Sequence, residues 1–277
     1  MESIGVLYNP GSERACTLAE EVAGWVSEQA YQVHVCDTDA VDQAPCLPEV
    51  ELLVTLGGDG SILRAARAAA PHDALIFGVN LGRVGFLAEV EPDDWRAALS
   101  GVLAGDYWVE SRLMLEATLY REGDRAIEAL ALNDVVVGRG GQARVVGLRT
   151  EIDRGYLTTF VADGLIIATP TGSTAYAMAA GGPVLPPELR NLLLVPVAPH
   201  LSLSRPIVLS EGVSVRVTVM GGYEVVLTVD GVLKAELEKG DEIEVVASPH
   251  EARFARLQNR TYFYNTLAER LLPRDHA

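Results

Sequence analysis

Residues 51–64 read ELLVTLGGDGSILR, and this stretch sets the fold expected for the first part of the chain. The apolar run at 51–56 predicts a buried strand, the glycines that follow predict a tight turn, and the Ala-rich run at 61–70 predicts a helix. The same alternation extends to both sides, with strands expected at 4–10, 31–35 and 74–80 and a helix at 93–105. Short apolar strands that alternate with helices indicate an α/β layer with a Rossmann-like parallel sheet.

The character of the sequence changes after about Tyr107, where turn signals and strand-like runs replace the alternation of strands and helices. The turn signals lie at 121–124, 140–141, 221–222 and 238–241, and the strand-like runs include 213–219, 223–229 and 242–246. Alternating β-rich runs between hairpin signals are typical of an antiparallel sheet. We therefore expect an α/β domain over residues 1–106, an antiparallel β domain over residues 107–259, and a helix at 262–272.

The composition provides ample material for a core and limits the partners. Hydrophobic residues make up 49% of the 277 residues, and the net charge is −16, from 22 basic and 38 acidic residues. Sequence-independent binding to nucleic acid or to an anionic membrane needs clusters of Lys and Arg. The sequence contains no such cluster, so we expect neither nucleic acid nor a membrane as a partner.

The cysteines and the N-terminal residues predict a cytoplasmic protein. Cys16, Cys36 and Cys46 are odd in number, and their spacing fits neither a disulfide framework nor a zinc site. Glu2 stands where a secretory signal would carry positive charge. No apolar stretch reaches the roughly 18 residues that a membrane span requires.

The glycine-rich turn after the strand at 51–56 has the features of a phosphate-binding loop with a carboxylate inside it. A strand, a glycine turn and a helix aim backbone N–H groups and the positive helix end at one point. Asp59 would repel a phosphate, so its presence suggests that it accepts a proton from an attacking hydroxyl or holds a metal ion beside the phosphates. Gly-Asp-Gly is also a common turn sequence without any such role. The candidate phosphate ligands are Gly57, Gly58, Gly60 and Ser61.

Arg64 lies one helical turn beyond Gly60, where it is either a further phosphate ligand or a surface arginine. The turn lacks the Lys-Ser/Thr of a Walker loop and does not have the GxGxxG spacing of a dinucleotide loop. It is similar to the Gly-Gly-Asp-Gly turn of NAD kinases, diacylglycerol-type lipid kinases and phosphofructokinases. This resemblance implies transfer of a phosphoryl group to a hydroxyl without identifying that hydroxyl.

The stretch DGLIIATPTGSTAYAMAAGGP, at 163–183, has the composition of a nucleoside pocket. Its four hydroxyl residues offer neutral hydrogen-bond donors, its alanines leave room for a ring, and Tyr176 can stack on that ring. A Ser/Thr helix cap would explain one of these hydroxyls but not four. Upstream, Asn133 and Asp134 stand at the start of an apolar strand. They either form hydrogen bonds to an adenine edge and a ribose diol or make a simple Asx turn.

Together these stretches resemble the NAD kinase family over nearly the whole chain. The matching stretches are the turn at 57–60, NLGRVGFLAEV at 80–90, Asn133-Asp134, the DGLI…TPTGSTAY block at 163–176, PHLSLSRPIVL at 199–209 and FYNTLAERL at 263–271. The TPTGSTAY block is the most specific of these motifs, and lipid kinases and phosphofructokinases lack it. We therefore favour an NAD kinase over a related kinase that acts on a lipid or sugar hydroxyl.

The resemblance implies both a fold and an activity. The fold is an α/β domain and a C-terminal β-sandwich-like domain, with the active site in the crevice between them and the tail at 260–277 packed back on the first domain. The activity is transfer of the terminal phosphoryl group of ATP, or of polyphosphate, to the 2′-hydroxyl of the adenosine ribose of NAD, which gives NADP. A divalent ion, Mg²⁺ carried with ATP, and a homodimer or homotetramer are also implied, and no residue is assigned as a metal ligand.

The resemblance assigns roles to individual residues as well. Asp59 matches the catalytic aspartate, which acts as a general base or orients the 2′-hydroxyl. Because the transition state of phosphoryl transfer is loose, positioning and charge neutralisation should matter more than base strength. The positions that match the family's dinucleotide contacts are Asp59, Gly60, Asn133, Asp134, Arg144, Asp163, Thr171, Thr174, Ala175, Tyr176 and Ala179.

Three positions depart from the family pattern. Ser61 replaces the commoner Thr and keeps the hydroxyl, Asp134 replaces the commoner Glu and is one methylene shorter, and Val232 stands where many members have Gln. The shorter Asp134 should lengthen its hydrogen bonds to a ribose and raise the KM.

A function other than catalysis is the alternative: a non-catalytic NAD(P) sensor. Such a sensor predicts a lost or disabled Asp59, whereas Asp59 is present in an intact turn.

Overall fold

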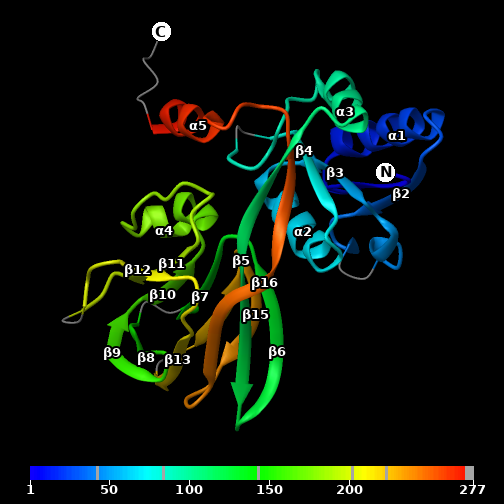
Figure 1. Ribbon diagram of the computed structural model, residues 1–277. Coiled ribbons are helices and arrows are strands. Elements are labelled where there is room, and N and C mark those ends of the chain that lie inside the picture. Colours follow the sequence, from blue (N-terminus) through cyan, green and yellow to red (C-terminus); the bar gives the residue numbers. More distant parts are fainter. Residues whose placement is uncertain (42–43, 83–84, 142–143, 201–202, 222–223, 272–277) are drawn as a thin grey trace. The chain divides into compact units, whose positions relative to one another are not determined.

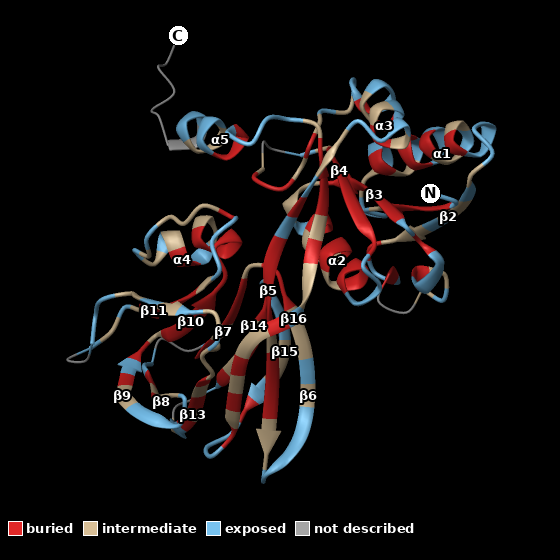
Figure 2. Ribbon diagram, viewed as in Figure 1, coloured by how far each residue is buried: buried red, intermediate tan, exposed pale blue. Residues whose placement is uncertain are grey.

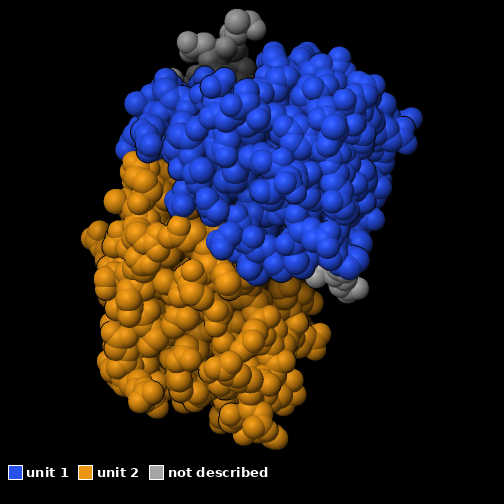
Figure 3. All heavy atoms as spheres, turned by 45° about the vertical axis from the view of Figure 1, so that its right-hand side comes forward, with its two compact units in different colours: residues 1–111, 252–277 blue, residues 112–251 orange. Residues whose placement is uncertain are grey.

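The computed structural model describes residues 1–277 except 42–43, 83–84, 142–143, 201–202, 222–223 and 272–277 (Figure 1). The chain folds into two compact units, which Figure 3 shows in different colours. The first unit comprises Met1–Ser111 and Ala252–Ala277, and the second comprises Arg112–Glu251. The chain therefore passes from one unit to the other twice.

The first unit is built on a parallel sheet with the strands β1 (Ser3–Tyr8), β2 (Gln32–Asp37), β3 (Leu52–Gly57) and β4 (Leu75–Asn80). Their order is β2-β1-β3-β4, and every neighbouring pair is parallel. The end of strand β16 (Glu242–Arg256) extends this sheet, with Arg253 opposite Leu75 in parallel register. The expected Rossmann-like parallel sheet is therefore confirmed.

Helices pack on this sheet and complete its core. They are α1 (Glu13–Glu28), α2 (Asp59–Ala69) and α3 (Trp95–Ala104). The unit also contains the helix α5 (Tyr262–Leu271) and the short 3₁₀ turns η2 (Leu47–Glu49) and η3 (Ala70–His72). Strands β3 and β4 are buried along their whole length, which explains their continuous apolar runs (Figure 2). One core cluster joins Phe77 of β4 to Val22 of α1 and Leu99 of α3. Across the described ranges of the chain, no helix is both long enough and apolar enough to span a membrane.

The second unit is a pair of antiparallel sheets. Its strands are β5 (Trp108–Arg121), which begins in the first unit, β6 (Asp124–Ala131), β7 (Asp134–Arg139), β8 (Val146–Ile152), β9 (Gly155–Ala162), β10 (Gly164–Ala168), β11 (Asn191–Val197), β12 (Ile207–Ser210), β13 (Val215–Gly221), β14 (Val225–Val229) and β15 (Val232–Leu237). One sheet has the order β12-β11-β10-β7-β14-β15, and the other contains β16-β13-β8-β9 with β5 and β6 attached. A single core cluster takes Val135 and Ile167 from the first sheet and Leu148 and Val217 from the second. The sheets therefore pack face to face, as a β-sandwich-like domain requires.

The four turn signals of the sequence lie between consecutive strands, as expected, but most of them do not join two strands that pair with each other. Only the signal at 121–124 joins two strands that pair with each other, β5 and β6. The signals at 140–141, 221–222 and 238–241 join strands of different sheets, and residue 222 itself lies outside the described residues. A turn sequence fixes the local direction of the chain, whereas the partner of each strand is set by the packing of the whole sheet.

Candidate active site

The glycine turn lies where β3 ends and α2 begins. Strand β3 ends at Gly57, Gly58 is the N-cap residue, and Asp59 is the first residue of α2. A side chain at position 57 would collide with Ser61, because a β-carbon built on Gly57 lies 2.2 Å from the Ser61 hydroxyl oxygen. The first turn of a helix leaves backbone N–H groups without intrahelical partners, and these groups attract an anion. The turn therefore offers the donors that a bound phosphate needs.

The carboxylate of Asp59 is held by backbone N–H groups of the segment after β4. Phe86 donates to Oδ2 at 3.1 Å, and Leu87 donates to Oδ1 at 3.4 Å. Gly85 lies so close that a β-carbon built there would be 1.9 Å from Oδ1. These two hydrogen bonds fix the orientation of the Asp59 carboxylate, and the residue as a whole is half-buried.

Arg64 of α2 is engaged with the loop after β2. Its guanidinium donates to the Thr38 carbonyl at 3.1 Å and forms an ion pair with Asp39. The Arg64 side chain is 38% exposed, so it can reach solvent on the surface of the unit. A phosphate would have to compete with Asp39 for this guanidinium, and the phosphate contact of Arg64 stays a prediction.

In the second unit, Asn133 and Asp134 lie at the start of β7, and their backbone is held on two sides. The carboxylate of Asp230 accepts the N–H groups of Leu132 at 3.1 Å, Asn133 at 2.8 Å and Asp134 at 3.2 Å. From the other side, the N–H of Thr169 donates to the Asn133 carbonyl at 2.9 Å, and its hydroxyl donates to the Leu132 carbonyl at 2.5 Å. These five bonds fix the path of the backbone before β7.

The carboxyl group of Asp134 is buried beside a second carboxylate. Only 5% of the residue is exposed. Burial, followed by the negative charge of Asp230, raises the pKa of Asp134 from 3.8 to about 7. The group therefore changes its protonation near neutral pH, and it can accept hydrogen bonds from two hydroxyls when it is ionised.

The hydroxyl motif forms a 3₁₀ turn, η4 (Thr171–Thr174), followed by a short helix, α4 (Tyr176–Ala179). This turn touches the segment described above, because a β-carbon built on Gly172 would lie 2.0 Å from the carbonyl oxygen of Asn133. The preceding strand β10 also pairs with β7, with Ala168 opposite Asp134. The structure thus brings together two motifs that lie far apart in the sequence.

The four hydroxyl residues of this motif serve different purposes. Thr169 and Ser173 are fully buried, and both bond to the main chain, Ser173 to the N–H of Leu185 at 2.9 Å. Thr174 donates to the carbonyl of Thr171 at 3.1 Å, and the Thr171 hydroxyl accepts a long bond of 3.5 Å from the buried Arg112. Two hydroxyls therefore hold the turn in place, and contact of Thr171 and Thr174 with a ligand stays a prediction.

A pocket of about 340 Å³ in the second unit brings two predicted residues to one cavity. Asp163 and Tyr176 both line it, together with apolar side chains such as Val136 and Val226. Asp163 forms an ion pair with Arg139, another lining residue, at 3.1 Å. Tyr176 is 46% exposed, so its ring is accessible to a ligand. Apolar walls with a few polar groups are typical of a small-molecule site.

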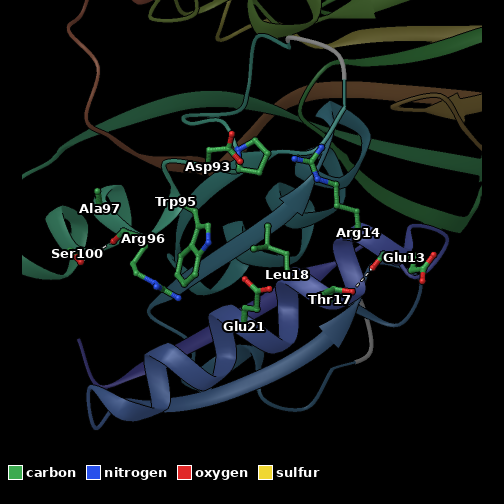
Figure 4. Close-up of a pocket in the computed structure, with 11 residues that line it drawn as sticks. Glu13, Arg14, Thr17, Leu18, Glu21, Asp93, Trp95, Arg96, Ala97 and Ser100 are labelled. Atoms are coloured by element: carbon green, nitrogen blue, oxygen red, sulfur yellow. Dashed lines mark hydrogen bonds between the residues drawn. The ribbon is translucent and has the colours of Figure 1, made fainter.

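A larger pocket, of about 1020 Å³, lies on the first unit along α1 and α3 and contains none of the predicted site residues (Figure 4). Acidic side chains, among them Glu21 and Asp93, are mixed there with Arg14 and Arg96 around the edge of Trp95. The mixture of charges gives no preference for a phosphate, so we do not assign the active site to this pocket.

The predicted site residues divide between the two units. The first unit carries Gly57, Gly58, Asp59, Gly60, Ser61 and Arg64, and the second carries Asn133, Asp134, Arg144, Asp163, Thr171, Thr174, Ala175, Tyr176 and Ala179. Arg144 is exposed in the connection between β7 and β8. Two residues beside the candidate site were not predicted: Asp230, which belongs to an Asp-Gly turn sequence, and Gly85, which is one of the glycines in NLGRVGFLAEV. Arg112, which donates to the Thr171 hydroxyl, was not predicted either, because the sequence carries no local signal for it.

Comparison with known proteins identifies the family. Two family models match the chain, the ATP-NAD kinase N-terminal domain over residues 37–107 and the ATP-NAD kinase C-terminal domain over residues 132–257. An NAD kinase of Heliobacterium modesticaldum is 41% identical over 275 residues, which cover 95% of this chain and 96% of the relative. An NAD kinase of Chloroflexus aurantiacus is 38% identical over 272 residues, which cover 98% of this chain and 99% of the relative.

Solved structures agree with this result. Yeast NADH kinase complexed with NADH matches with a TM-score of 0.86 at 25% identity, and the match covers 100% of this chain and 89% of that one. An NAD kinase from Archaeoglobus fulgidus in complex with ATP matches with a TM-score of 0.75 at 26% identity, covering 97% of this chain and 98% of that one. The chain therefore belongs to the ATP-NAD kinase family.

Proposed function

We propose that this chain transfers the terminal phosphoryl group of ATP to the 2′-hydroxyl of the adenosine ribose of NAD, producing NADP and ADP. The family to which the chain belongs is one of NAD kinases, phosphotransferases with an alcohol group as acceptor. The observation that carries the proposal is the carboxylate of Asp59, which stands at the start of α2 with two backbone N–H groups fixing its orientation.

The chemistry needs alignment more than it needs a strong base. A bond forms between the 2′-oxygen and the γ-phosphorus, the bond from that phosphorus to the oxygen bridging the β-phosphorus breaks, and the 2′-hydroxyl loses its proton. In our proposal Asp59 orients this hydroxyl and accepts its proton. Because the transition state is loose, a fixed carboxylate contributes mainly by holding the nucleophile in line. The backbone N–H groups at Gly58 and Gly60 would bind the charge of the phosphates.

A divalent ion, Mg²⁺ in this proposal, would arrive on the phosphates of ATP. Among the residues that the structure describes, no group of three or more His, Cys, Asp or Glu side chains is placed to hold a metal ion. Mg²⁺ is commonly held by one or two carboxylates together with phosphates and water, and Asp59 beside a phosphate-binding turn fits that donor set. The ion would supply charge neutralisation for the transferred group.

We assign binding of the dinucleotide to the second unit. Asp163 and Tyr176 share the 340 Å³ pocket, which has a suitable size for part of a dinucleotide. Asn133 and Asp134 stand on a backbone that Asp230 holds in place, and such a fixed pair can read an adenine edge and ribose hydroxyls. The yeast relative complexed with NADH and the Archaeoglobus relative in complex with ATP support a dinucleotide and ATP as the two substrates. A homodimer or homotetramer and a cytoplasmic location complete the proposal.

The test is direct formation of NADP by the purified protein. The protein is incubated with NAD, ATP and magnesium, and the product is read with an NADP-specific dehydrogenase. Parallel reactions replace NAD with NADH, ATP with polyphosphate, or magnesium with a chelator. We expect NADP with NAD and ATP, and its loss when the metal is chelated. Absence of product with either dinucleotide and either donor would contradict the proposal.

A further inference from the structure

We infer that the segment Gly85–Glu89, braced by the buried Arg256, positions the carboxylate of Asp59, so that Gly85 and Arg256 are positioning residues for phosphoryl transfer. The inference rests on the proposed catalytic role of Asp59. It assigns a function to residues that touch neither the phosphates nor the dinucleotide in the proposed mechanism.

The segment Gly85–Glu89 contacts the Asp59 carboxylate directly. The N–H groups of Phe86 and Leu87 bind the two carboxylate oxygens, one each. Gly85 lies against the same group, where a β-carbon would be 1.9 Å from Oδ1 and 2.5 Å from Cγ. A β-carbon at this position would therefore force the Asp59 carboxylate to move.

The segment is supported by Arg256, at the end of β16. The Arg256 guanidinium donates to the Leu87 carbonyl at 2.9 Å and to the Glu89 carboxylate at 3.0 Å. The other oxygen of Glu89 accepts the N–H groups of Leu257 at 2.7 Å and Gln258 at 2.8 Å. The residue Leu87 is therefore held on both sides, with its N–H on Asp59 and its carbonyl on Arg256.

Arg256 is itself held in place by further buried contacts. Arg256 is 1% exposed, and it pairs with Glu110 at 2.9 Å and with the hydroxyl of Tyr262 at 3.2 Å. The Tyr262 hydroxyl in turn donates to Glu110 at 2.8 Å. On the same helix, α5, the ring of Phe263 lies 6.0 Å from the ring of Phe86. The start of α5 is thus connected through buried polar bonds to the donors that hold Asp59.

A buried ion cluster of this kind is a weak source of stability, because desolvation offsets much of the attraction between the charges. Its geometric effect is more specific. The guanidinium is planar and donates in fixed directions, so it sets the orientation of the peptide that it binds. Here Arg256 binds the carbonyl of Leu87, whose N–H group binds the Asp59 carboxylate.

The first experiment changes Gly85 to Ala and measures steady-state kinetics. The added methyl group would push the Asp59 carboxylate away from its present place. A displacement of about 1 Å lowers turnover by about tenfold to a hundredfold. The KM for NAD should stay within about twofold of the wild type, because the proposed dinucleotide contacts other than Asp59 and Gly60 belong to the second unit and are unchanged. The control is Gly101→Ala in α3, where a β-carbon would make an ordinary contact of 3.6 Å with Leu257. An unchanged kcat in Gly85→Ala would overturn the inference.

The second experiment is a stability cycle that does not depend on activity. Gly85→Ala should lower the melting temperature, and the double variant Gly85→Ala/Asp59→Ala should recover the loss, because the methyl group then fits the space that the carboxylate has left. Additive losses in the double variant would overturn the contact between the two residues. A wild type that makes no NADP would instead contradict the proposed function, and this cycle would still decide the contact.

The third experiment tests the support from Arg256. In Arg256→Lys the single ammonium group cannot reach Leu87, Glu89 and Glu110 together, and in Tyr262→Phe only the hydroxyl is removed. We expect kcat to fall several-fold in both variants while the KM for NAD is kept. The matched control is Arg253→Lys on the same strand, whose guanidinium donates to the Asp73 carbonyl at 2.9 Å. Lower stability with an unchanged kcat in both variants would show a purely structural role and overturn the inference.

Discussion

The carboxylate of Asp230 accepts the backbone N–H of Asn133 at 2.8 Å, although the two residues lie far apart in the sequence. The N–H of Asp230 returns a bond of 2.9 Å to the carbonyl of Asp134. Asp230 and Gly231 have φ angles of 48° and 74° and form the tight turn between β14 and β15. Asp-Gly is a preferred sequence for such a turn, so one local structure forms the hairpin and anchors a proposed substrate-binding pair.

Asp230→Ala should raise the KM for NAD about tenfold and lower the stability of the second unit by about 2 kcal/mol or more, since three backbone donors lose their acceptor. The matched control is Asp153→Ala in the turn between β8 and β9. Asp153 also has a positive φ angle, 49°, and accepts one backbone N–H, from Ser214 at 2.9 Å. Steady-state kinetics and urea unfolding of both variants measure the effect. A KM for NAD that changes equally in both would contradict the specific role of Asp230.

Asp134→Asn should remove a pH-dependent part of the stability. The pKa of Asp134 is about 7 in the folded protein against an ordinary value of 3.8, so the folded state holds this proton more tightly than the unfolded chain. The stabilisation by the proton is complete below about pH 4, decreases as the pH rises, and is lost above about pH 7. From about pH 5 to pH 8 the wild type should therefore lose up to about 3 kcal/mol relative to the variant.

Urea unfolding of the wild type and Asp134→Asn at both pH values measures this difference. Asp230→Asn supplies a second check, because loss of the neighbouring charge should lower the pKa of Asp134 and weaken the dependence on pH. A difference in unfolding free energy that is the same at both pH values would show that Asp134 does not titrate in this range.

Gly172→Ala should disturb the contact between the hydroxyl turn and the strand β7. The new methyl group would lie 2.0 Å from the Asn133 carbonyl oxygen, which belongs to the backbone and cannot rotate away. We expect a loss of stability of about 1–3 kcal/mol together with a higher KM for NAD. Gly212→Ala is the control, because a β-carbon there meets nothing within 4 Å. A Gly172→Ala protein as stable as the control would contradict the close packing.

Tyr176→Ala should raise the KM for NAD more than the KM for ATP, because an accessible ring beside the 340 Å³ pocket is proposed to stack on the dinucleotide. The expected change for NAD is about tenfold, the size of a well-placed aromatic contact. Tyr156→Ala removes another exposed ring, on β9, and serves as the control. Equal effects on the two substrates would argue against stacking on NAD.

Local patterns in the sequence predicted the elements but not their long-range contacts. The strand, turn and helix at 51–70 were predictable because apolar runs, glycines and alanines each have a strong local preference. The antiparallel character of the second half followed from alternation, yet three of the four turn signals join strands of different sheets. Which strands become neighbours depends on the packing of both sheets, and a turn sequence carries no information about that packing.

In the candidate site, too, residues with a local sequence signal were predicted, whereas their long-range contacts were not. Asp59, Asn133 and Asp134 became candidates from their place beside turns and strands, and their proposed roles came from the resemblance to the NAD kinase family. The groups around them, the segment Gly85–Leu87 and the carboxylate of Asp230, were not predicted, because each contacts a residue that only the folded chain brings near. A buried cation such as Arg256 reads in the sequence like any other arginine, and only its burial and its partners distinguish it.

Turnover by Asp59→Asn tests the central claim most directly. NADP formation and dinucleotide binding are measured for the wild type, for Asp59→Asn, and for Asp94→Asn, which changes an exposed aspartate at the start of another helix, α3. The account predicts that Asp59→Asn loses about 10²- to 10⁴-fold in turnover, keeps its affinity for NAD, and that Asp94→Asn behaves like the wild type. Near-normal turnover by Asp59→Asn would contradict the account.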